Sequence, residues 1–170
     1  MIQFEKVSYD TFRAACRKLN PRMQDPDIQK AYDAITIPKR GTKGSAGYDF
    51  VTPFPFKIGF WKRLLRKQTV IPLGIKAMMP PDVVLLLMPR SGTGFKTGTA
   101  LSNTIGVIDS SYYNNPSNEG HMMVSFDPGF ANWKAKRGDR IIQGIFVDYW
   151  TADDEDGLGE RTGGFGSTGR

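Results

Sequence analysis

The sequence predicts an all-β protein: an antiparallel jelly roll or β-barrel, with a helix added at the N-terminus and a flexible tail at the C-terminus. The first observation is the density of chain-breaking residues. There are 19 glycines and 11 prolines among 170 residues, which leaves few segments with room for a helix longer than about ten residues. The second is a series of short apolar runs bounded by turn residues. Without helical periods between them, these runs favour a sandwich or barrel over a parallel α/β sheet.

One helix is predicted near the N-terminus, over residues 8–19. Ser8 is a suitable N-cap and Asn20-Pro21 would end the helix. The apolar residues between them fall on one helical face: Phe12, Ala15, Cys16 and Leu19. We expect this helix to pack on the outside of the barrel. Residues 20–35 carry no clear signal and are interpreted as a connection, so residues 1–35 form an N-terminal helical extension.

Five apolar runs are the predicted strands of a main domain over residues 36–150. The runs are residues 69–75, 83–88, 104–108, 122–126 and 141–147. A chain of this length buries a full core in one domain. Residues 151–170 follow that domain as an acidic linker and a glycine-rich tail.

Charge is unevenly placed along the chain. The net charge of +6 suggests an anionic partner without identifying it. Residues 60–67 combine four cations with four large apolar residues, a mixture found in interfacial and nucleic-acid-binding segments. We prefer an inserted loop or short helix that packs Trp61, Leu64 and Leu65 on the domain. The acidic residues 153–156 are interpreted as a solvated linker.

The composition argues against several kinds of protein. A single cysteine, Cys16, excludes an internal disulfide framework. Without a signal peptide or an apolar run of membrane-spanning length, we expect a cytoplasmic protein with no membrane partner. Cys16 and the single histidine, His121, are too few for a zinc site, and His121 has no nucleophile signature beside it. We expect His121 to be a solvated loop residue.

The last eleven residues, 160–170, form a glycine-rich run with hydroxyls, one ring and two arginines. The run matches G-x-G-x-x-G, but a dinucleotide site needs a strand before this motif and a helix after it, so that match is spurious. A P-loop is not indicated either, because it needs Gly-Lys-Ser/Thr. Glycines let backbone N–H groups approach an anion, and Arg161, Ser167 and Thr168 add donors. With Phe165 available for stacking, we interpret the run as a mobile lid. A disordered Gly/Ser tail is the alternative.

Other segments place polar groups where an apolar run ends, which is where a β-scaffold presents side chains to a ligand. Residues 89–92, Pro-Arg-Ser-Gly, suit an anion cradle and are equally an ordinary turn. In residues 106–112, Asp109 ends an apolar run and Tyr112 follows three residues later. Such a carboxylate can deprotonate a water and such a ring can stack on a sugar, although Asp109 alone also suits a turn or cap.

Two more segments complete the pattern. Residues 137–143 supply Gln143 as an amide donor and residues 44–50 supply Asp49, although each segment is also explained as a structural turn. Taken in order with the tail, the segments closely resemble the five motifs of the homotrimeric dUTP diphosphatases (dUTPases). The five motif-like segments are residues 44–50, 89–92, 106–112, 138–143 and 163–169, within a resemblance that covers roughly residues 36–170.

The resemblance implies a jelly-roll subunit that forms a homotrimer. Each active site would then be built from three chains, with the C-terminal tail of one closing over a pocket on others. It implies cleavage of dUTP between the α- and β-phosphates to give dUMP and pyrophosphate. It also implies Mg²⁺ held through the phosphates and water rather than directly by the protein. The expected partners are therefore dUTP and further copies of the chain, without a specific nucleic acid.

The resemblance also assigns roles to residues. Asp109 would activate the attacking water, Asn103 would read the uracil edge, and Tyr112 would lie against the deoxyribose. Asp49 would support the site through hydrogen bonds. The other assigned residues would bind substrate: Gly106, Val107 and Ile108 through the hairpin backbone, Arg90, Ser91, Gly92 and Gln143 on the phosphates, and Arg161, Phe165, Gly166, Ser167 and Thr168 from the tail.

The sequence departs from the usual motifs at several points. Arg161 lies one position closer to Gly-Gly-Phe than the family arginine, so Arg170 or Arg137 are alternatives for contact with the γ-phosphate. Residues 113–120 are lengthened, and residues 57–67 and the N-terminal helix are additional. Insertions of this kind lie on surfaces and suit contact with another protein.

Three other functions are alternatives. A dCTP deaminase-related enzyme shares the fold, but needs a carboxylate placed for the exocyclic amine, for which no residue stands out. A nucleotide-gated regulatory module that binds a protein partner through the extra segments is the alternative from a different class. Nucleic-acid binding, suggested by net charge alone, would show a steep salt dependence.

Overall fold

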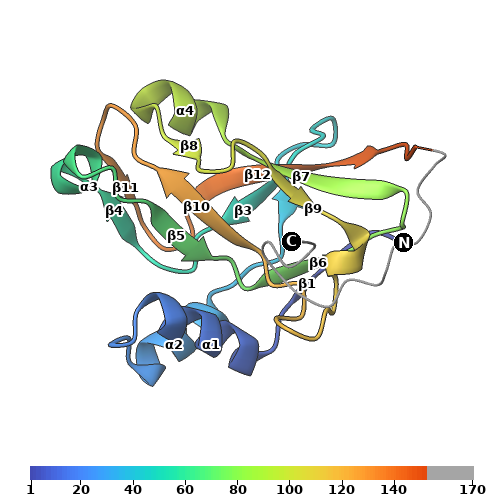
Figure 1. Cartoon of the computed structure of the whole chain (residues 1–170), viewed down its shortest axis with the longest axis horizontal. Helices are drawn as coiled ribbons and strands as arrows, with labels where there is room; N and C mark the ends of the chain where they lie inside the picture. Colours follow the sequence, from blue (N-terminus) through green and yellow to red (C-terminus); the bar gives the residue numbers. More distant parts are fainter. Residues whose placement is uncertain (153–170) are drawn as a thin grey trace.

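The structure is a computed structural model, described here over residues 1–152, and it is built mainly from antiparallel strands (Figure 1). The strands are β1 (Gln3–Lys6), β2 (Lys39–Arg40), β3 (Tyr48–Val51), β4 (Phe56–Ile58), β5 (Thr69–Pro72), β6 (Ile75–Met78), β7 (Val83–Pro89), β8 (Ala100–Leu101), β9 (Gly106–Ile108), β10 (Met123–Asp127), β11 (Trp133–Ala135) and β12 (Arg140–Asp148). The helices are α1 (Tyr9–Leu19), α2 (Asp25–Asp33), α3 (Phe60–Leu64) and α4 (Ser91–Thr97), with a 3₁₀ turn η1 (Ser110–Tyr112).

The strands form one larger sheet and three smaller ones. The larger sheet has the order β2-β3-β12-β7-β9, and the smaller ones are β5-β10-β8, β1-β6 and β11-β4. Every one of these pairings is antiparallel. The predicted antiparallel all-β fold is confirmed. Because β12 lies between β3 and β7, the motif segments on these three strands are neighbours.

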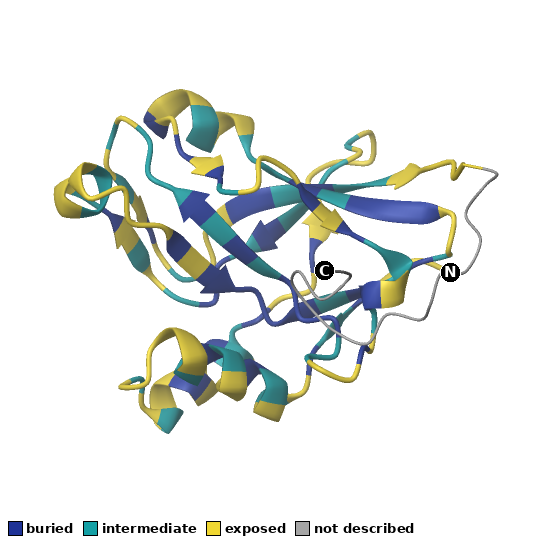
Figure 2. Cartoon of the chain, in the orientation of Figure 1, coloured by how far each residue is buried: buried dark blue, intermediate teal, exposed yellow. Residues whose placement is uncertain are grey.

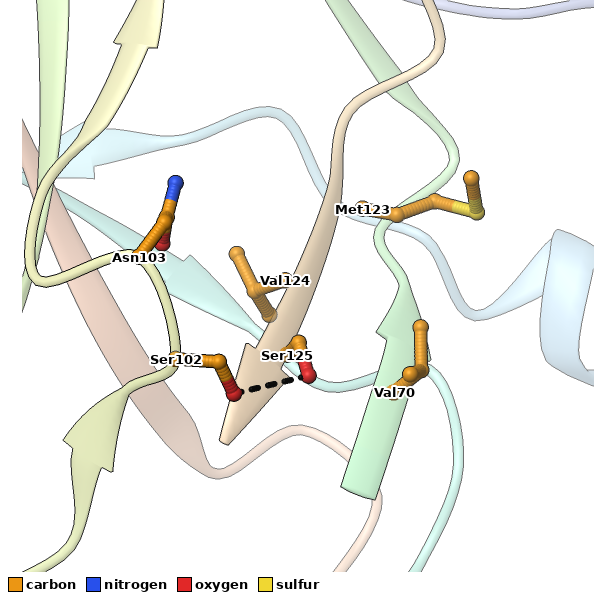
Figure 3. A pocket seen from close by; sticks show the side chains of 6 residues that line it. All are labelled: Val70, Ser102, Asn103, Met123, Val124 and Ser125. Carbon is orange, nitrogen blue, oxygen red and sulfur yellow. Dashed lines mark hydrogen bonds between the residues drawn. The ribbon is translucent and has the colours of Figure 1, made fainter. Parts of the chain in front are cut away.

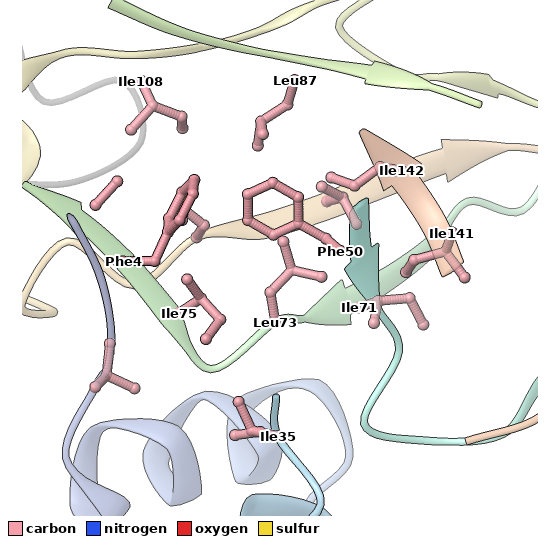
Figure 4. Packing of buried hydrophobic residues seen from close by; sticks show 14 of the residues in the cluster. Phe4, Ile35, Phe50, Ile71, Leu73, Ile75, Leu87, Ile108, Ile141 and Ile142 are labelled. Carbon is pink, nitrogen blue, oxygen red and sulfur yellow. The ribbon is translucent and has the colours of Figure 1, made fainter. Parts of the chain in front are cut away.

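The core lies between these sheets. Phe4, Phe50, Leu87 and Ile142 face one another there (Figure 4). The Phe4 ring meets the Phe50 ring edge to face, with 5.4 Å between the ring centroids, a favoured geometry for aromatic pairs. Burial of this kind, at about 25 cal/mol per Å² of apolar surface, is the main term that holds the sheets together.

The predicted strand over residues 69–75 is wrong in one respect, because the chain turns before its end and forms β5 and β6 separately. Gly74 has a φ of +69°, and a Cβ at this position would lie 2.2 Å from Cδ1 of Ile35. Only glycine meets both conditions, the left-handed backbone and the close packing. The run over 104–108 is likewise shortened to β9, because Thr104 has a φ of 65° within a turn.

The predicted N-terminal helix is confirmed as α1. The Ser8 hydroxyl accepts a hydrogen bond from the Thr11 N–H at 3.2 Å, as an N-cap does. Phe12 and Cys16 are buried, and this burial raises the pKa of the Cys16 thiol to about 12. Leu19 lies at the exposed end of the face. In Figure 1, α1 and α2 lie side by side below the strands, outside the barrel.

The connection predicted over residues 20–35 is wrong, because it contains α2. The helix begins at Asp25-Pro26, and proline is favoured in a first turn. Only Ile28 and Ala31 are buried, so the apolar signal was weak. Asp25 forms ion pairs with Arg13 at 2.9 Å and Arg17 at 2.8 Å, which join α2 to α1.

Segment 113–120 is tied to the start of α1 through Glu119. Its carboxylate accepts hydrogen bonds from the Ser8 N–H at 3.0 Å, the Ser8 hydroxyl, and the Thr11 hydroxyl at 2.6 Å. Lys76 lies 3.5 Å away. Burial alone would raise the pKa of Glu119, but these donors lower it to about 2. Segment 113–120 and the start of α1 therefore form one connected structure.

The expectation that His121 is a solvated loop residue is wrong. The side chain is 1% exposed, and its Nε2 accepts a hydrogen bond from the Gly74 N–H at 2.9 Å. Burial lowers the pKa of the imidazole to about 4, so the ring is neutral at pH 7. His121 therefore helps to fix the turn at Gly74 that divides β5 from β6.

The expectation that residues 60–67 pack their apolar side chains on the domain is also wrong. Trp61 is 70% exposed, and Leu64 and Leu65 are exposed as well. Figure 2 shows the contrast between this segment and α1, whose inner face is buried. The reason is that the cations of α3 are the residues bonded to the domain: Lys62 to Thr69 and Arg63 to Asn132.

Candidate functional site

A charged cluster forms where β3, β12 and β7 lie side by side. Asp49 on β3 lies opposite Gln143 on β12, and Gln143 lies opposite Met88 on β7. Arg90 directly follows β7, and its Nε lies 2.9 Å from Oδ1 of Asp49. Three of the predicted site residues therefore meet here. The strand register brings them together, although they are far apart in the sequence.

Asp49 holds a second arginine as well. Arg140 NH1 lies 3.1 Å from the other carboxylate oxygen, Oδ2. The Asp49 side chain is 16% exposed, and the paired guanidinium groups are more exposed. A carboxylate between two guanidinium groups fixes both while leaving their other N–H groups able to bind an anion. Arg140 was missed in the sequence, although it lies inside the fourth motif-like segment.

Gln143 is positioned with help from a glycine. A Cβ at Gly47 would lie 3.2 Å from Oε1 of Gln143, closer than most such contacts. Gly47 therefore leaves room for the amide, which explains a glycine in the first motif-like segment. Ser91 and Gly92 form the exposed first turn of α4, next to Arg90. The expected cradle over 89–92 is thus the end of β7 joined to a short helix.

Asn103 lies in the turn between β8 and β9, which belong to different sheets and do not form the expected hairpin with each other. The turn is tight: the Thr104 N–H donates to the Leu101 carbonyl at 2.9 Å, and the Ser102 hydroxyl donates to Asp127 Oδ1 at 2.6 Å. A hollow of about 350 Å³ opens beside Asn103, on the face of β5 and β10 (Figure 3). Its lining is mostly apolar: Val70, Ser102, Asn103, Met123, Val124 and Ser125. An amide beside apolar surface suits a planar ring with a polar edge.

Asp109 follows β9 directly and begins the turn η1. Its carbonyl accepts a hydrogen bond from the Tyr112 N–H at 3.0 Å. The segment 106–108 alternates, with Gly106 and Ile108 buried and Val107 exposed. Since the backbone of β9 is paired with β7, Asp109 is held at a fixed place by a rigid element.

Tyr112 is packed into the chain, with 4% of its surface exposed. Its hydroxyl donates to the His121 carbonyl at 2.9 Å and accepts from Nδ2 of Asn118 at 2.7 Å. The segment that follows Tyr112 therefore fixes this ring. Contact between Tyr112 and a sugar stays a prediction.

Asp109 lies beside the start of β7, and Arg90 follows the end of that strand. Ile108 pairs with Leu85, so Asp109 comes opposite the start of β7, whereas Arg90 follows its last residue. The six residue steps between Val84 and Arg90 correspond to about 20 Å at about 3.3 Å a residue. One chain does not bring its own Asp109 and Arg90 to the same phosphate group.

Some predicted features lie outside the described residues. The tail residues Arg161, Phe165, Gly166, Ser167 and Thr168 are among them, as is the acidic linker 153–156. Within residues 1–152, no group of three or more His, Cys, Asp or Glu residues is placed to hold a metal ion. In the same range, no helix is both long and apolar enough to span a membrane.

The comparisons with known proteins define the class of this all-β chain, the hydrolases of nucleotides. A family model described as dUTPase matches residues 33–169. The chain is 43% identical to deoxyuridine 5'-triphosphate nucleotidohydrolase of Lactococcus lactis over 141 residues, which cover 79% of this chain and 89% of that protein. This chain therefore belongs to the dUTPase family.

Solved structures agree with this assignment. A crystal structure of dUTPase from Streptococcus mutans matches with a TM-score of 0.63 and 29% identity, covering 88% of this chain and 98% of that one. A mutant dUTPase from phage phi11 of S. aureus matches with a TM-score of 0.61 and 17% identity, over 90% and 94% of the two chains. That phage protein is described as coordinating a structural Mg(II) ion.

Proposed function

We propose that the chain hydrolyses dUTP to dUMP and pyrophosphate in active sites shared between copies. Membership of the dUTPase family makes the chain a dUTP diphosphatase; the shared site and the mechanism are the proposed parts. The observation that carries the shared site is the separation of Asp109 and Arg90 by about 20 Å along β7. A triphosphate that meets both groups needs Asp109 from one copy and Arg90 from another. A homotrimer supplies this geometry through a closed arrangement of identical contacts.

In the proposed mechanism, Asp109 accepts a proton from the water that attacks the α-phosphorus, and pyrophosphate leaves. Arg90, Ser91, Gly92 and Gln143 bind phosphate oxygens. Asp49 and its ion pairs orient Arg90 for this task. Most of the catalysis then comes from positioning and from neutralising charge.

The base and the metal have proposed places as well. The amide of Asn103 and the backbone of Gly106, Val107 and Ile108 would read the uracil edge, with the hollow beside Asn103 as the site of the ring. The donor chemistry fits Mg²⁺ held through the substrate, since this ion prefers phosphates and waters with few protein ligands. When bound, Mg²⁺ neutralises phosphate charge. The tail residues Arg161, Phe165, Gly166, Ser167 and Thr168 would close over the nucleotide.

The setting of this activity is proposed to be cytoplasmic. The single thiol, Cys16, is buried and has no second cysteine with which to form an internal disulfide. A dUTP diphosphatase also needs access to free nucleotides and Mg²⁺. Release of pyrophosphate from dUTP, dCTP, dTTP and UTP with Mg²⁺ tests the substrate. Release from dUTP alone supports the proposal, whereas deamination of dCTP would support the deaminase-related alternative.

A mixing experiment tests the shared site. Asp109→Asn and Arg90→Ala variants are each expected to lose at least about 100-fold in turnover, because the first removes the base that activates the water and the second a group that binds the phosphates. Refolded together in equal amounts, they should recover about a quarter of the wild-type rate, since a random trimer completes that share of its sites. Recovery would be absent if one chain supplied both groups. Each variant refolded alone is the control.

A further inference from the structure

The helix α3 turns its apolar side chains to the solvent and its cations toward the domain. Lys62 Nζ donates to the Thr69 hydroxyl at 2.8 Å, and Arg63 NH1 donates to Oδ1 of Asn132 at 2.8 Å. The exposed apolar residues are Phe60, Trp61, Leu64 and Leu65, each with more than half of its surface accessible. A surface helix normally has the opposite orientation. The two polar anchors therefore hold an apolar face outward.

The surroundings of α3 carry the basic excess of the chain. We define the α3 lobe as residues 53–72 and 128–138, which are joined by the pairing of β4 with β11. The lobe contains eight Lys or Arg residues and no Asp or Glu, whereas the rest of the chain has 15 Lys or Arg against 17 Asp or Glu. A surface with this charge attracts an acidic partner and repels a basic one.

The α3 lobe is also hollowed. A depression of about 300 Å³ lies between α3 and the turn before β11, lined by Phe60, Arg63, Leu64, Gly129 and Phe130. Its walls are mostly apolar, and Arg63 supplies a guanidinium at the side. One large apolar side chain fits such a depression, and carboxylates next to it would meet the other cations of the lobe.

This shape favours a protein segment over an anionic bilayer. A flat lipid surface leaves a depression unfilled, whereas a side chain enters it. Lys62 and Arg63 are directed to Thr69 and Asn132, not outward to headgroups. Membrane-surface helices have their cations on the polar face beside the headgroups.

We propose that the α3 lobe docks an acidic segment of another protein, whose large apolar side chain enters the depression beside Phe60 and Phe130. Carboxylates of that segment pair with the cations of the lobe. In Figure 1, α3 lies at the left end of the molecule and β9 toward the right, so this surface is separate from β9 and from Asp109, which follows it. The inference goes beyond dUTP hydrolysis and does not depend on it.

The test is selection of binding peptides from a displayed library of random twelve-residue sequences, using the full-length protein. We expect the selected peptides to be rich in Asp and Glu and to carry Trp, Phe or Leu. Their affinity, measured by fluorescence anisotropy, should fall at least about tenfold for the double variant Trp61→Ser, Leu64→Ser. The matched control is Trp150→Ser, which removes an exposed tryptophan (95%) at the far end of β12 and should change affinity less than twofold.

Several outcomes would overturn the proposal. One is a set of peptides without acidic enrichment; another is equal binding to the double variant and the wild type. A third is that the wild type binds phosphatidylserine vesicles in preference to the peptides and the double variant does not. This result would assign the face to a membrane. A fall in molar mass of the double variant by light scattering would assign it to contact between copies. Both changes are on the surface, so retained dUTP cleavage checks folding.

Discussion

Two regions of the molecule, the N-terminal helix α1 and the α3 lobe, place similar side chains in opposite ways. In α1, Phe12 and Cys16 point into the core, and the polar groups at the N-terminal end of the helix bind Glu119. In α3, Trp61 and its apolar neighbours point outward, and the cations bind the domain. Amphipathic spacing therefore shows that a segment has two faces, but not which face is turned inward. The contacts available on the neighbouring surface decide that.

The strongest test of this contrast substitutes one phenylalanine in each region. Phe12→Ala removes a ring that is 0% exposed and packs on the Phe54 and Tyr32 rings, so we expect a loss of about 3–5 kcal/mol in the free energy of unfolding. Phe60→Ala removes a ring that is 57% exposed and should cost less than about 0.5 kcal/mol. Urea denaturation of both variants measures the difference. Similar losses would show that α3 is covered in solution.

The second test uses pH. Since burial lowers the pKa of His121 from its ordinary 6.5 to about 4, the unfolded chain binds the proton first as pH falls. The neutral His121 ring therefore contributes fully to the free energy of unfolding above pH 6.5. This contribution is lost as the pH falls to 4, and the total loss is roughly 3 kcal/mol. Urea denaturation between pH 7 and 4 should show this slope in the wild type and a smaller one in His121→Gln. Equal slopes would contradict the assigned burial.

The third test addresses Glu119, which links segment 113–120 to α1. Glu119→Gln keeps the shape but weakens the hydrogen bonds from Ser8 and Thr11, and we expect a loss of about 1–2 kcal/mol at pH 7, discounted for partial exposure. The lowered pKa of about 2 means that this contribution is present above pH 4.5 and lost toward pH 2. Thermal denaturation at pH 7 measures it. The exposed Asp148→Asn serves as control, and an equal shift there would count against a specific link.

Much of the fold was predictable from local signals. The N-cap at Ser8 and the apolar spacing behind it gave α1, and the uninterrupted run before Pro89 gave β7. The helix α2 was not predictable with equal ease, because only Ile28 and Ala31 are buried in it. The division of β5 from β6 depends on the packing of Ile35 and Phe12 against Gly74, which no local pattern contains.

The candidate site was predictable as a set of residues but not as a geometry. The motif-like segments named Asp49, Arg90 and Gln143, and the structure places them together through the register of three strands. The sequence did not indicate the ion pair of Arg140 with Asp49, nor that His121 is buried in a polar-looking stretch. Both depend on contacts between segments that are distant in the chain.

The register of β7 and β9 has a consequence for specific activity. A solitary chain has its carboxylate and its phosphate-binding arginine about 20 Å apart, so under the proposed mechanism it turns over no substrate. The rate per milligram of protein would then fall on dilution, with a midpoint set by the dissociation constant of the assembly. The total rate of dUTP cleavage in a cell would then rise more than proportionally with the concentration of the chain.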